Sequence, residues 1–236
     1  MGVVSNKVVL VTGAAGNLGQ AVAQTLISSG ARCVLADRSR DRLAALYLSP
    51  SESVLLAGDT DFTDEAAVSR MVDSALKRFG RIDGLVNTIG GFTGGKPVHE
   101  DDLAGWDRMM AINLRTTLLS CRAVIPAMIR QGGGRIVNVG ARAALGGVAG
   151  LGAYVAAKSA VIRLSETLAA ELKDKAITVN CVLPGTIDTP ENRRDMPKAD
   201  FSRWVPPSDI AEVIVFLVSD ASRAVSGASI PVYGRS

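Results

Sequence analysis

The sequence has few aromatic residues, and none of its apolar runs is long. Only 4% of its 236 residues are aromatic, whereas 47% are hydrophobic and 24 are glycine. A core of Val, Ile, Leu and Ala with abundant glycine for turns is typical of buried parallel strands and unlike a disordered chain. No apolar run reaches about 18 residues, so we expect no contact with a membrane.

Cysteine is also scarce, and the sequence offers no grouping that would bind a metal. Cys33, Cys121 and Cys181 lie far apart, each inside an expected strand or helix. We therefore expect buried free thiols in a reducing compartment. No His, Cys and carboxylate residues have the spacing of metal ligands, and the single histidine, His99, lies in a polar loop where we expect it to be exposed.

The distribution of charge argues against a nucleic-acid-binding protein, and the N-terminal segment argues against a secreted one. The formal net charge is only +3, and the densest basic pair, Arg193 and Arg194, is followed by Asp195. This scatter is unlike a nucleic-acid-binding surface. The first 16 residues show no charged region followed by a long apolar core and a cleavage site, so we expect a cytoplasmic protein.

Seven short apolar runs alternate with longer segments of helical pattern. The expected strands are 7–11, 32–36, 53–57, 83–87, 135–139, 177–183 and 228–232, and the expected helices are 18–29, 41–47, 64–79, 107–129, 152–173 and 208–218. The alternation predicts a single-domain α/β Rossmann fold over 1–236, a doubly wound seven-stranded parallel sheet with helices on both faces. Irregular segments, 89–102 and 184–207, follow the fourth and sixth strands. Within the second, the length and position of the loop from Pro190 to Pro206 permit a mobile lid.

A glycine-rich turn after the first strand indicates a nucleotide site. In VTGAAGNLG, Gly13, Gly16 and Gly19 precede or open a helix that begins near Leu18. Glycine there lets the backbone approach a pyrophosphate, whose charge the helix N-terminus favours.

The end of the second strand bears on the choice of cofactor. Asp37 has the spacing expected of a carboxylate that accepts hydrogen bonds from an adenosine ribose. Because this carboxylate would repel a 2′-phosphate, NAD(H) is favoured, while the neighbouring Arg38 keeps NADP(H) as an alternative. Asp61 and Phe62, which follow the third strand, are expected to flank the adenine.

Tyr154 and Lys158 are the strongest candidates for proton transfer. They lie four residues apart in an expected helix and therefore share one face. A positive charge roughly 4 Å from a phenol, at an effective dielectric of about 20, is worth some 4 kcal/mol, or about three pKa units. This predicts a Tyr154 pKa near neutrality, which suits general acid–base catalysis.

Together these features resemble the short-chain dehydrogenase/reductase family over essentially the full length. The resemblance rests on the glycine turn with Thr12, Asp37, the 87–90 segment, Asn113, Tyr154 with Lys158, and the 184–189 segment. It implies a nicotinamide cofactor, with Tyr154 as proton donor or acceptor. It also implies that Lys158 lowers the tyrosine pKa and holds the nicotinamide ribose, and that Asn113 holds a proton-relay water.

The resemblance also implies a set of cofactor contacts. The residues expected to make them are Gly13, Gly16, Asn17, Leu18, Gly19, Asp37, Arg38, Asp61, Phe62, Asn87, Gly90, Tyr154, Lys158, Pro184, Gly185, Ile187 and Thr189. Members of the family usually form homodimers or homotetramers, and their substrates are small molecules.

Two positions depart from the family pattern. Asn17 stands where a glycine is usual, with Gly16 one place earlier, and Ala141 stands thirteen residues before Tyr154, where the family has a catalytic serine. Loss of one such hydrogen-bond donor typically costs about 3 to 4 kcal/mol in the transition state. The gap favours a substrate that is already strongly electrophilic, such as a quinonoid conjugated imine.

Several segments also resemble quinonoid dihydropteridine reductases, divergent members of the family that lack this serine. The matching segments are the GxxGxLG turn, IGGFTGG, GARAALGG and DTPENRRDMPKADFSRW. They imply a quinonoid dihydropteridine substrate, with Phe92 either lining the pterin side of the pocket or anchoring its loop. Asn113, Pro184-Gly185 and SGASIPVYG instead resemble the ordinary branch.

Two alternatives therefore stay open. One is an ordinary carbonyl reductase or alcohol dehydrogenase of the 3-oxoacyl reductase type, in which Asn138, Thr88 or a water replaces the serine. The other is a nucleotide-binding protein without catalysis, against which the presence of Tyr154, Lys158 and Asn113 argues.

Overall fold

The computed structural model describes residues 3–48 and 51–236, which build around one parallel sheet. Its seven strands run in the order β3-β2-β1-β4-β5-β6-β7, which confirms the predicted fold class. They are β1 (Val8–Thr12), β2 (Arg32–Ala36), β3 (Val54–Ala57), β4 (Gly84–Asn87), β5 (Gly134–Val139), β6 (Ile177–Pro184) and β7 (Ser229–Val232).

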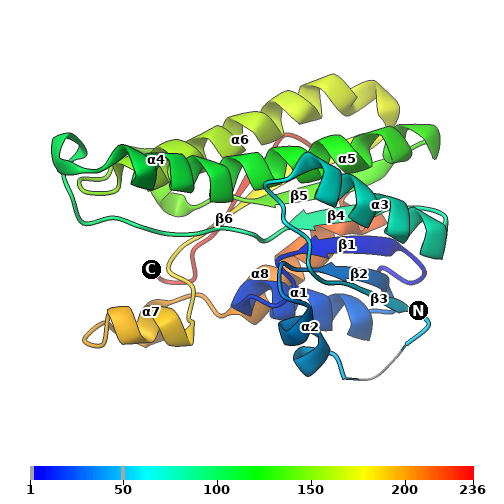
Figure 1. Cartoon of the computed structure of the whole chain (residues 1–236), viewed down its shortest axis with the longest axis horizontal. Coiled ribbons are helices and arrows are strands. Elements are labelled where there is room, and N and C mark those ends of the chain that lie inside the picture. Colours follow the sequence, from blue (N-terminus) through cyan, green and yellow to red (C-terminus); the bar gives the residue numbers. More distant parts are fainter. Residues whose placement is uncertain (1–2, 49–50) are drawn as a thin grey trace.

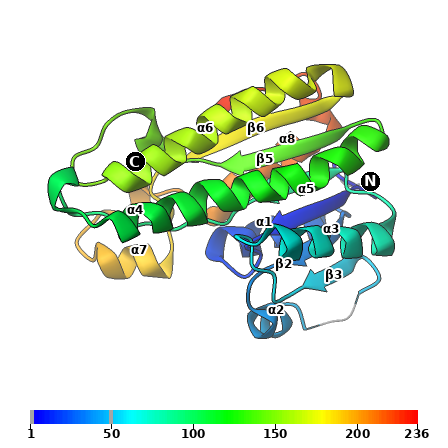
Figure 2. The ribbon, with the colours of Figure 1, turned by 45° about the horizontal axis from the view of Figure 1, so that its top comes forward.

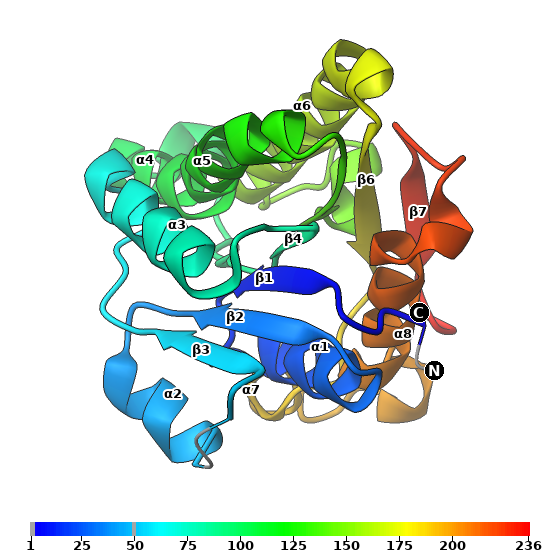
Figure 3. The same ribbon diagram turned by 90° about the vertical axis from the view of Figure 1, so that its right-hand side faces the viewer.

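Helices cover both faces of this sheet (Figure 1). The face seen below the sheet in Figure 3 carries α1 (Asn17–Ser28) and α8 (Pro207–Val218), with α2 (Arg40–Leu46) beside the edge strand β3. The opposite face carries α3 (Glu65–Phe79), α5 (Thr116–Arg130) and α6 (Gly152–Leu172). Figure 2 shows α5 and α6 lying over β5 and β6.

The apolar residues of the central strands contribute to the hydrophobic cores on both faces of the sheet. In β1, Val9 and Val11 join the core under α1 and α8, whereas Val8 and Leu10 join the core under α3 and α5. Alternate residues of a strand point to opposite faces, so a strand covered on both sides must be apolar throughout. This double burial is why the strands could be predicted from short runs of Val, Ile and Leu.

Side-chain caps fix where several helices begin. The Asp64 carboxylate accepts a hydrogen bond from the Ala66 backbone N–H at 2.9 Å and starts α3. Gly80, in the left-handed region at φ +78°, ends the same helix. Thr189 caps α7 (Pro190–Asp195) by accepting from the Asn192 N–H at 3.2 Å. Both capping arrangements are ones that sequence reasoning can recognise.

The predicted helix 107–129 differs from the observed one. The structure has α4 (Leu103–Met109), then a π-helical turn η2 (Met110–Arg115), then α5. The Thr116 N–H donates to the Ala111 carbonyl five residues earlier, which defines the wider turn. A periodicity of 3.6 residues cannot reveal one inserted residue, and π-turns occur frequently at functional sites.

The segment 184–207, predicted as irregular, holds two short helices. They are α7 and the 3-10 turn η5 (Phe201–Arg203). Both are too short to show an apolar period. The remaining short turns are η1 (Val98–Glu100), η3 (Arg142–Leu145), η4 (Lys173–Lys175) and η6 (Asp220–Ser222).

The cysteines are free and buried, as predicted. Burial raises the pKa of Cys33 and of Cys121 to about 12, and that of Cys181 to about 11, so these thiols stay protonated. His99 is exposed, with a side-chain exposure of 80%. Over 3–48 and 51–236, no helix has the length and apolarity needed to cross a bilayer, and no three side chains of His, Cys, Asp or Glu gather as metal ligands would.

Candidate active site

A pocket of about 380 Å³ opens at the carboxyl ends of the strands, beside β1 and β4. Strand order reverses direction between these two strands, and open α/β sheets bind ligands at such points. The predicted cofactor residues that line it are Gly13, Gly16, Asp37, Arg38, Asp61, Phe62 and Gly90. The pocket therefore gathers residues from four separate strand ends.

The glycine turn is shaped to admit an anion. Gly13 has φ +70°, and a side chain there would begin 3.0 Å from Ile89 Cγ1. A Cβ at Gly19 would collide with the Gly13 carbonyl oxygen. Gly16 caps α1 without a side-chain hydrogen bond, and no acidic residue lies in the first turn of that helix. The first backbone N–H groups of α1 are thus left for a ligand, which fits the pyrophosphate of a dinucleotide.

Asp37 is held in place by the backbone around it. Its carboxylate accepts hydrogen bonds from the Ala15 N–H and the Ser39 N–H, both at 3.1 Å. An ionised carboxylate offers about four acceptor positions, so two such bonds leave capacity for ribose hydroxyls. The predicted use of Asp37 therefore fits the structure.

Two arginines from the start of α2 and the loop before it lie near this carboxylate. Arg38 is exposed at the pocket wall, and Arg42 donates from Nη2 to the Ala15 carbonyl at 2.6 Å. Arg42 was missed by sequence reasoning, although it lies only four residues after Arg38. A guanidinium pair beside Asp37 makes the charge of the adenosine site mixed rather than purely acidic.

The rest of the pocket wall contains further residues that sequence reasoning missed. They are Thr63, Thr88, Ile89, Arg108, Ala111, Ile112 and Thr116. Asp61 accepts bonds from the Thr63 N–H at 2.8 Å and the Thr63 hydroxyl at 2.7 Å, while Phe62 is 4% exposed and belongs to the core. The two predicted adenine neighbours thus reach the pocket, but Phe62 also packs the sheet.

Asn87 lies outside the pocket wall, in a chain of buried polar side chains. The Thr12 hydroxyl donates to Asn87 Oδ1 at 3.2 Å, Asn87 Nδ2 donates to Asn138 Oδ1 at 2.8 Å, and Asn138 Nδ2 donates to the Ser165 hydroxyl at 2.9 Å. This chain of hydrogen bonds links β1, β4, β5 and α6.

Asn138 is fully buried and its amide is hydrogen-bonded to Ser165, so it is unsuited to replace the missing serine. Thr88 is also engaged, since its hydroxyl donates to the Thr12 carbonyl at 2.6 Å.

Asn113 sits in the π-helical turn and fastens the loop after β4. Its Nδ2 donates to the Gly91 and Met109 carbonyls, each at 3.1 Å, and its Oδ1 accepts from the Gly91 N–H at 3.2 Å. The side chain is fully buried. A Cβ at Gly90 would lie 3.1 Å from both Asn113 Oδ1 and Lys158 Nζ, so the loop passes close to both residues.

Tyr154 and Lys158 lie on α6, but their protonation differs from the prediction. Burial raises the pKa of Tyr154 to about 12, whereas a value near neutrality was predicted. Lys158 Nζ instead donates to the Val139 carbonyl at 2.8 Å, and burial lowers its pKa to about 8. The prediction was wrong because it counted the attraction between charges and omitted the cost of removing each group from water.

Gly140 and Ala141, where a polar side chain is missing, differ in what their surroundings allow. A side chain at Gly140 would begin 2.7 Å from Leu183 Cδ2 and 2.9 Å from Cys181 Sγ, so close packing requires glycine. Ala141, at the serine position, is 7% exposed and extended. Nearby, the exposed Phe92 ring meets the Tyr154 ring edge-on, with ring centres 5.0 Å apart.

The predicted contacts after β6 do not line the nucleotide pocket. Gly185 packs against Tyr233 and Ser236, Ile187 forms a parallel bridge with Val205, and Thr189 caps α7. Trp204 is 9% exposed and packs against Phe201, with ring centres 4.8 Å apart and ring planes tilted by 52°. This segment therefore forms its own packed unit at the carboxyl end of the sheet.

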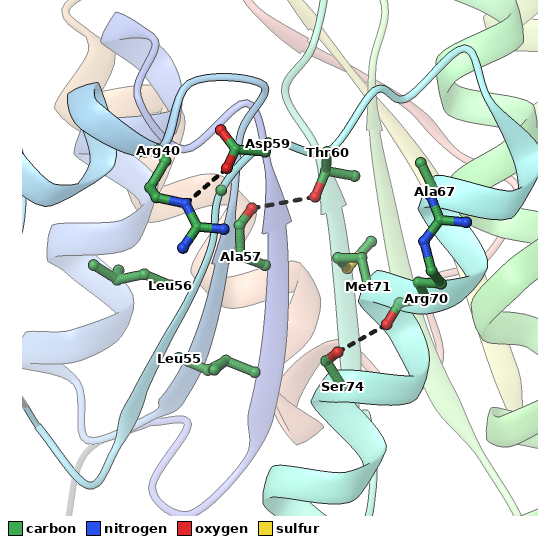
Figure 4. A pocket seen from close by; sticks show the side chains of 11 residues that line it. Arg40, Leu55, Leu56, Ala57, Asp59, Thr60, Ala67, Arg70, Met71 and Ser74 are labelled. Carbon is green, nitrogen blue, oxygen red and sulfur yellow. Dashed lines mark hydrogen bonds and ion pairs between the residues drawn. The ribbon is translucent and has the colours of Figure 1, made fainter.

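A second pocket, of about 290 Å³, lies at the edge strand β3, between that strand and α3 (Figure 4). Arg40 and Asp59 form an ion pair of 2.7 Å at its rim, and Met71 and Ser74 enter from α3. None of the predicted site residues lines it. We assign the chemistry to the first pocket and its surroundings.

The buried ammonium of Lys158 leads to a pH-dependent stability. Its pKa in the folded protein, about 8, lies below the ordinary 10.5, so the native state releases this proton before the unfolded chain does. Relative to a Lys158→Met variant, the free energy of unfolding of the wild type should rise by about 3 kcal/mol between pH 8 and pH 10.5. Urea unfolding of both proteins across this range measures the difference, and a difference independent of pH would contradict the burial of a charged Lys158.

Comparison with known proteins supports a single family. The sequence pattern described as short chain dehydrogenase matches residues 7–200. The chain is 35% identical over 246 residues to 2-(S)-hydroxypropyl-CoM dehydrogenase 3 of Xanthobacter autotrophicus, covering 97% of this chain and 96% of that protein.

Solved structures share the fold over nearly the whole chain. Carveol dehydrogenase from Mycobacterium avium in complex with NAD is similar with a TM-score of 0.91 and 29% identity, covering 99% of this chain and 98% of that chain. A protein named ElxO, with NADP bound, is similar with a TM-score of 0.90 and 26% identity, covering 97% and 98% respectively.

Proposed function

Since this chain belongs to the short chain dehydrogenase family, and is therefore an NAD(P)-dependent oxidoreductase, we propose that it interconverts a secondary alcohol and a ketone. The observation that carries the proposal is the pair Tyr154 and Lys158 on one helix, next to a loop that Asn113 fastens. The named relatives are dehydrogenases of varied substrates, which favours this ordinary reaction over a pterin-specific one.

Tyr154 performs the proton transfer in this proposal. With its pKa raised to about 12, the phenol keeps its proton at neutral pH and can donate it to a carbonyl oxygen. In the opposite direction Tyr154 must first lose its own proton, and the tyrosinate oxygen then receives the proton of the alcohol. The nicotinamide, when bound, supplies or accepts the hydride.

Lys158 and Asn113 position the groups around this transfer. Below its pKa of about 8, the Lys158 ammonium places a positive charge on the same helix face as Tyr154, which favours the tyrosinate formed when the phenol donates its proton. The hydrogen bond to the Val139 carbonyl fixes that ammonium at the end of β5. Asn113 holds Gly91, so the loop after β4 keeps its place along the pocket.

For the cofactor, we favour NAD(H) over NADP(H). Asp37 lines the pocket with two backbone hydrogen bonds already made, and its charge opposes a 2′-phosphate. Arg38 and Arg42 line the same pocket, and their positive charges favour the 2′-phosphate of NADP(H). Steady-state KM values for NADH and NADPH test the choice, and a lower KM for NADPH would mean that the guanidinium pair outweighs Asp37.

Quinonoid dihydropteridine reduction is the second candidate, and Ala141 is the observation that favours it. The buried methyl group of Ala141 supplies no hydrogen bond to a substrate carbonyl, and both proposed substitutes with side chains are engaged elsewhere. A strongly electrophilic substrate depends less on that bond. The exposed ring of Phe92 against Tyr154 offers an aromatic surface for a flat substrate.

One assay separates these candidates. NADH or NADPH oxidation is followed with a panel of ketones, with 3-oxoacyl thioesters, and with quinonoid 6-methyldihydropterin generated in the cuvette. Turnover of ketones supports the ordinary reaction, whereas rapid turnover of the pterin alone supports the second candidate. Binding of dinucleotide with turnover of no substrate class would support a protein without catalysis.

Introducing a serine at position 141 tests whether the missing hydroxyl limits the reduction of ketones. Ala141→Ser is expected to raise kcat for simple ketones by about 10²-fold, because a hydroxyl at this position can donate to the developing oxyanion. Turnover of the quinonoid pterin should change little. Steady-state kinetics of both proteins with both substrates provide the comparison, and no gain with ketones would mean that Ala141 does not limit carbonyl reduction.

A further inference from the structure

A hydrogen bond between distant parts of the chain joins the glycine turn to α7. Asn17 Nδ2 donates to the Glu191 carboxylate at 2.7 Å, across 174 positions of sequence. Asn17 is the first residue of α1, and Glu191 lies in the first turn of α7. Both helices lie on the same side of the sheet (Figure 3). Asn17 is also the position at which the sequence departs from the usual glycine.

The α7 end of this bond is held firmly. The Arg193 guanidinium forms two bonds with the Asp188 carboxylate, at 2.6 and 2.7 Å. Asn192 Nδ2 donates to the Ile187 carbonyl at 2.8 Å, and Thr189 caps the helix. Glu191 is therefore presented from a short helix with a defined position rather than from a free loop.

Asn17, at the other end of the bond, lies at the N-terminus of α1, where we expect the pyrophosphate to bind. Asn17 follows the capping Gly16, and the first backbone N–H groups of α1 face that region. Ile187 and Thr189, which lead directly into α7, are among the residues that the family resemblance implies as cofactor contacts, although they do not line the pocket beside β1 and β4. The bond from Asn17 to Glu191 thus ties α7 to the N-terminus of α1, beside the expected position of the pyrophosphate.

We propose that Asn17 and Glu191 form a clasp over the cofactor groove, which slows the release of bound dinucleotide. The proposal rests on the use of a nicotinamide dinucleotide by this site. Because the bond lies at the N-terminus of α1, where the pyrophosphate would be held, we expect it to act on dissociation and to leave the proton transfer at Tyr154 unchanged. Asn17 and Glu191 are positioning residues in this scheme, not catalytic ones.

The charge of Glu191 adds a second effect. Its pKa is held below the usual value because its own backbone N–H and the Asn17 amide donate to the carboxylate, so it is ionised at neutral pH. An ionised carboxylate near a pyrophosphate is repelled by it. Glu191→Gln keeps an acceptor for the Asn17 amide and removes that repulsion, so it should retain the clasp and bind dinucleotide at least as tightly as the wild type.

The test measures the dissociation rate of NADH, or of NADPH if that binds more tightly. Stopped-flow fluorescence follows the bound reduced dinucleotide while an excess of the oxidised form displaces it. Asn17→Gly and Glu191→Ala are each expected to speed release by roughly three- to tenfold, the range for loss of one typical intramolecular hydrogen bond. The double variant should be no faster than either single one, because both remove the same bond.

Two controls and two contrary results complete the design. Glu191→Gln should release the dinucleotide within about twofold of the wild type, and Glu171→Ala, an exposed acidic residue near the far end of α6, should leave the rate unchanged. Unchanged rates in Asn17→Gly and Glu191→Ala would overturn the clasp, as would additive effects in the double variant. If the wild type binds neither NADH nor NADPH, the proposed function itself is wrong. This outcome is distinct from a failure of the clasp, because it is seen with the wild type alone.

Discussion

Replacement of Tyr154 by phenylalanine is expected to lower kcat by about 10²- to 10⁴-fold, the contribution of a well-placed proton donor. The variant keeps the ring that meets Phe92 and packs beside Met109, Ala153 and Ala157, so the fold around it should be preserved. It loses only the hydroxyl. Initial rates with the best substrate of the panel, together with the thermal midpoint of unfolding, measure both expectations.

Dinucleotide binding provides the control for this variant. The Kd for NADH should stay within about threefold of the wild-type value, since the hydroxyl is one of many contacts expected with the cofactor. Full activity in the variant would assign the proton transfer to another group and remove the central role of Tyr154. Loss of both activity and binding would point instead to a structural role.

Gly19→Ala is expected to have the second large effect, this time on binding. The added methyl group would collide with the Gly13 carbonyl oxygen and lie 2.9 Å from Ala14 Cα. Backbone atoms cannot move aside as a flexible side chain can, so the turn must open. We expect the free energy of unfolding to fall by about 1 to 3 kcal/mol. NADH affinity should fall by roughly 10- to 100-fold, as the hydrogen bonds from the α1 N-terminus to the pyrophosphate are lost.

Gly147→Ala is the matched control for this substitution. A Cβ at Gly147 meets no atom within 4 Å, and its backbone is outside the left-handed region. Chemical denaturation and NADH titration of both variants give the comparison. Equal behaviour of the two would show that the turn tolerates a side chain and that its glycines are not required for close approach.

The fold could be predicted largely from the sequence because the central strands, such as β1 and β4, are buried on both faces. Val8, Val9, Leu10 and Val11 all enter a core, so the run is apolar without interruption. Segments whose form depends on a single contact were harder to predict. The helix α7 is defined by the Thr189 cap and a proline at its start, and it is too short to show a period.

The pocket that gathers Gly13 and Asp37 could also be predicted, since its determinants are local. Gly13 needs a positive φ, and Asp37 follows directly from the end of β2. The protonation of Tyr154 and Lys158 could not be predicted from their spacing. It depends on how far each group is removed from water and on the Val139 carbonyl, which the fold brings to Lys158 from another strand end.

The π-helical turn between α4 and α5 determines how this stretch of chain tolerates a change of length. Deleting one residue between Met110 and Arg115 would allow a continuous α-helix with a regular ladder of hydrogen bonds. Each residue turns an α-helix by about 100°, so α4 would rotate by that angle against α5. Met109 would then leave Ala153 and Ala157 on α6. The site, rather than the stability of the helix, thus fixes the number of residues here, and alignments should show no gaps in this turn among proteins that share the site.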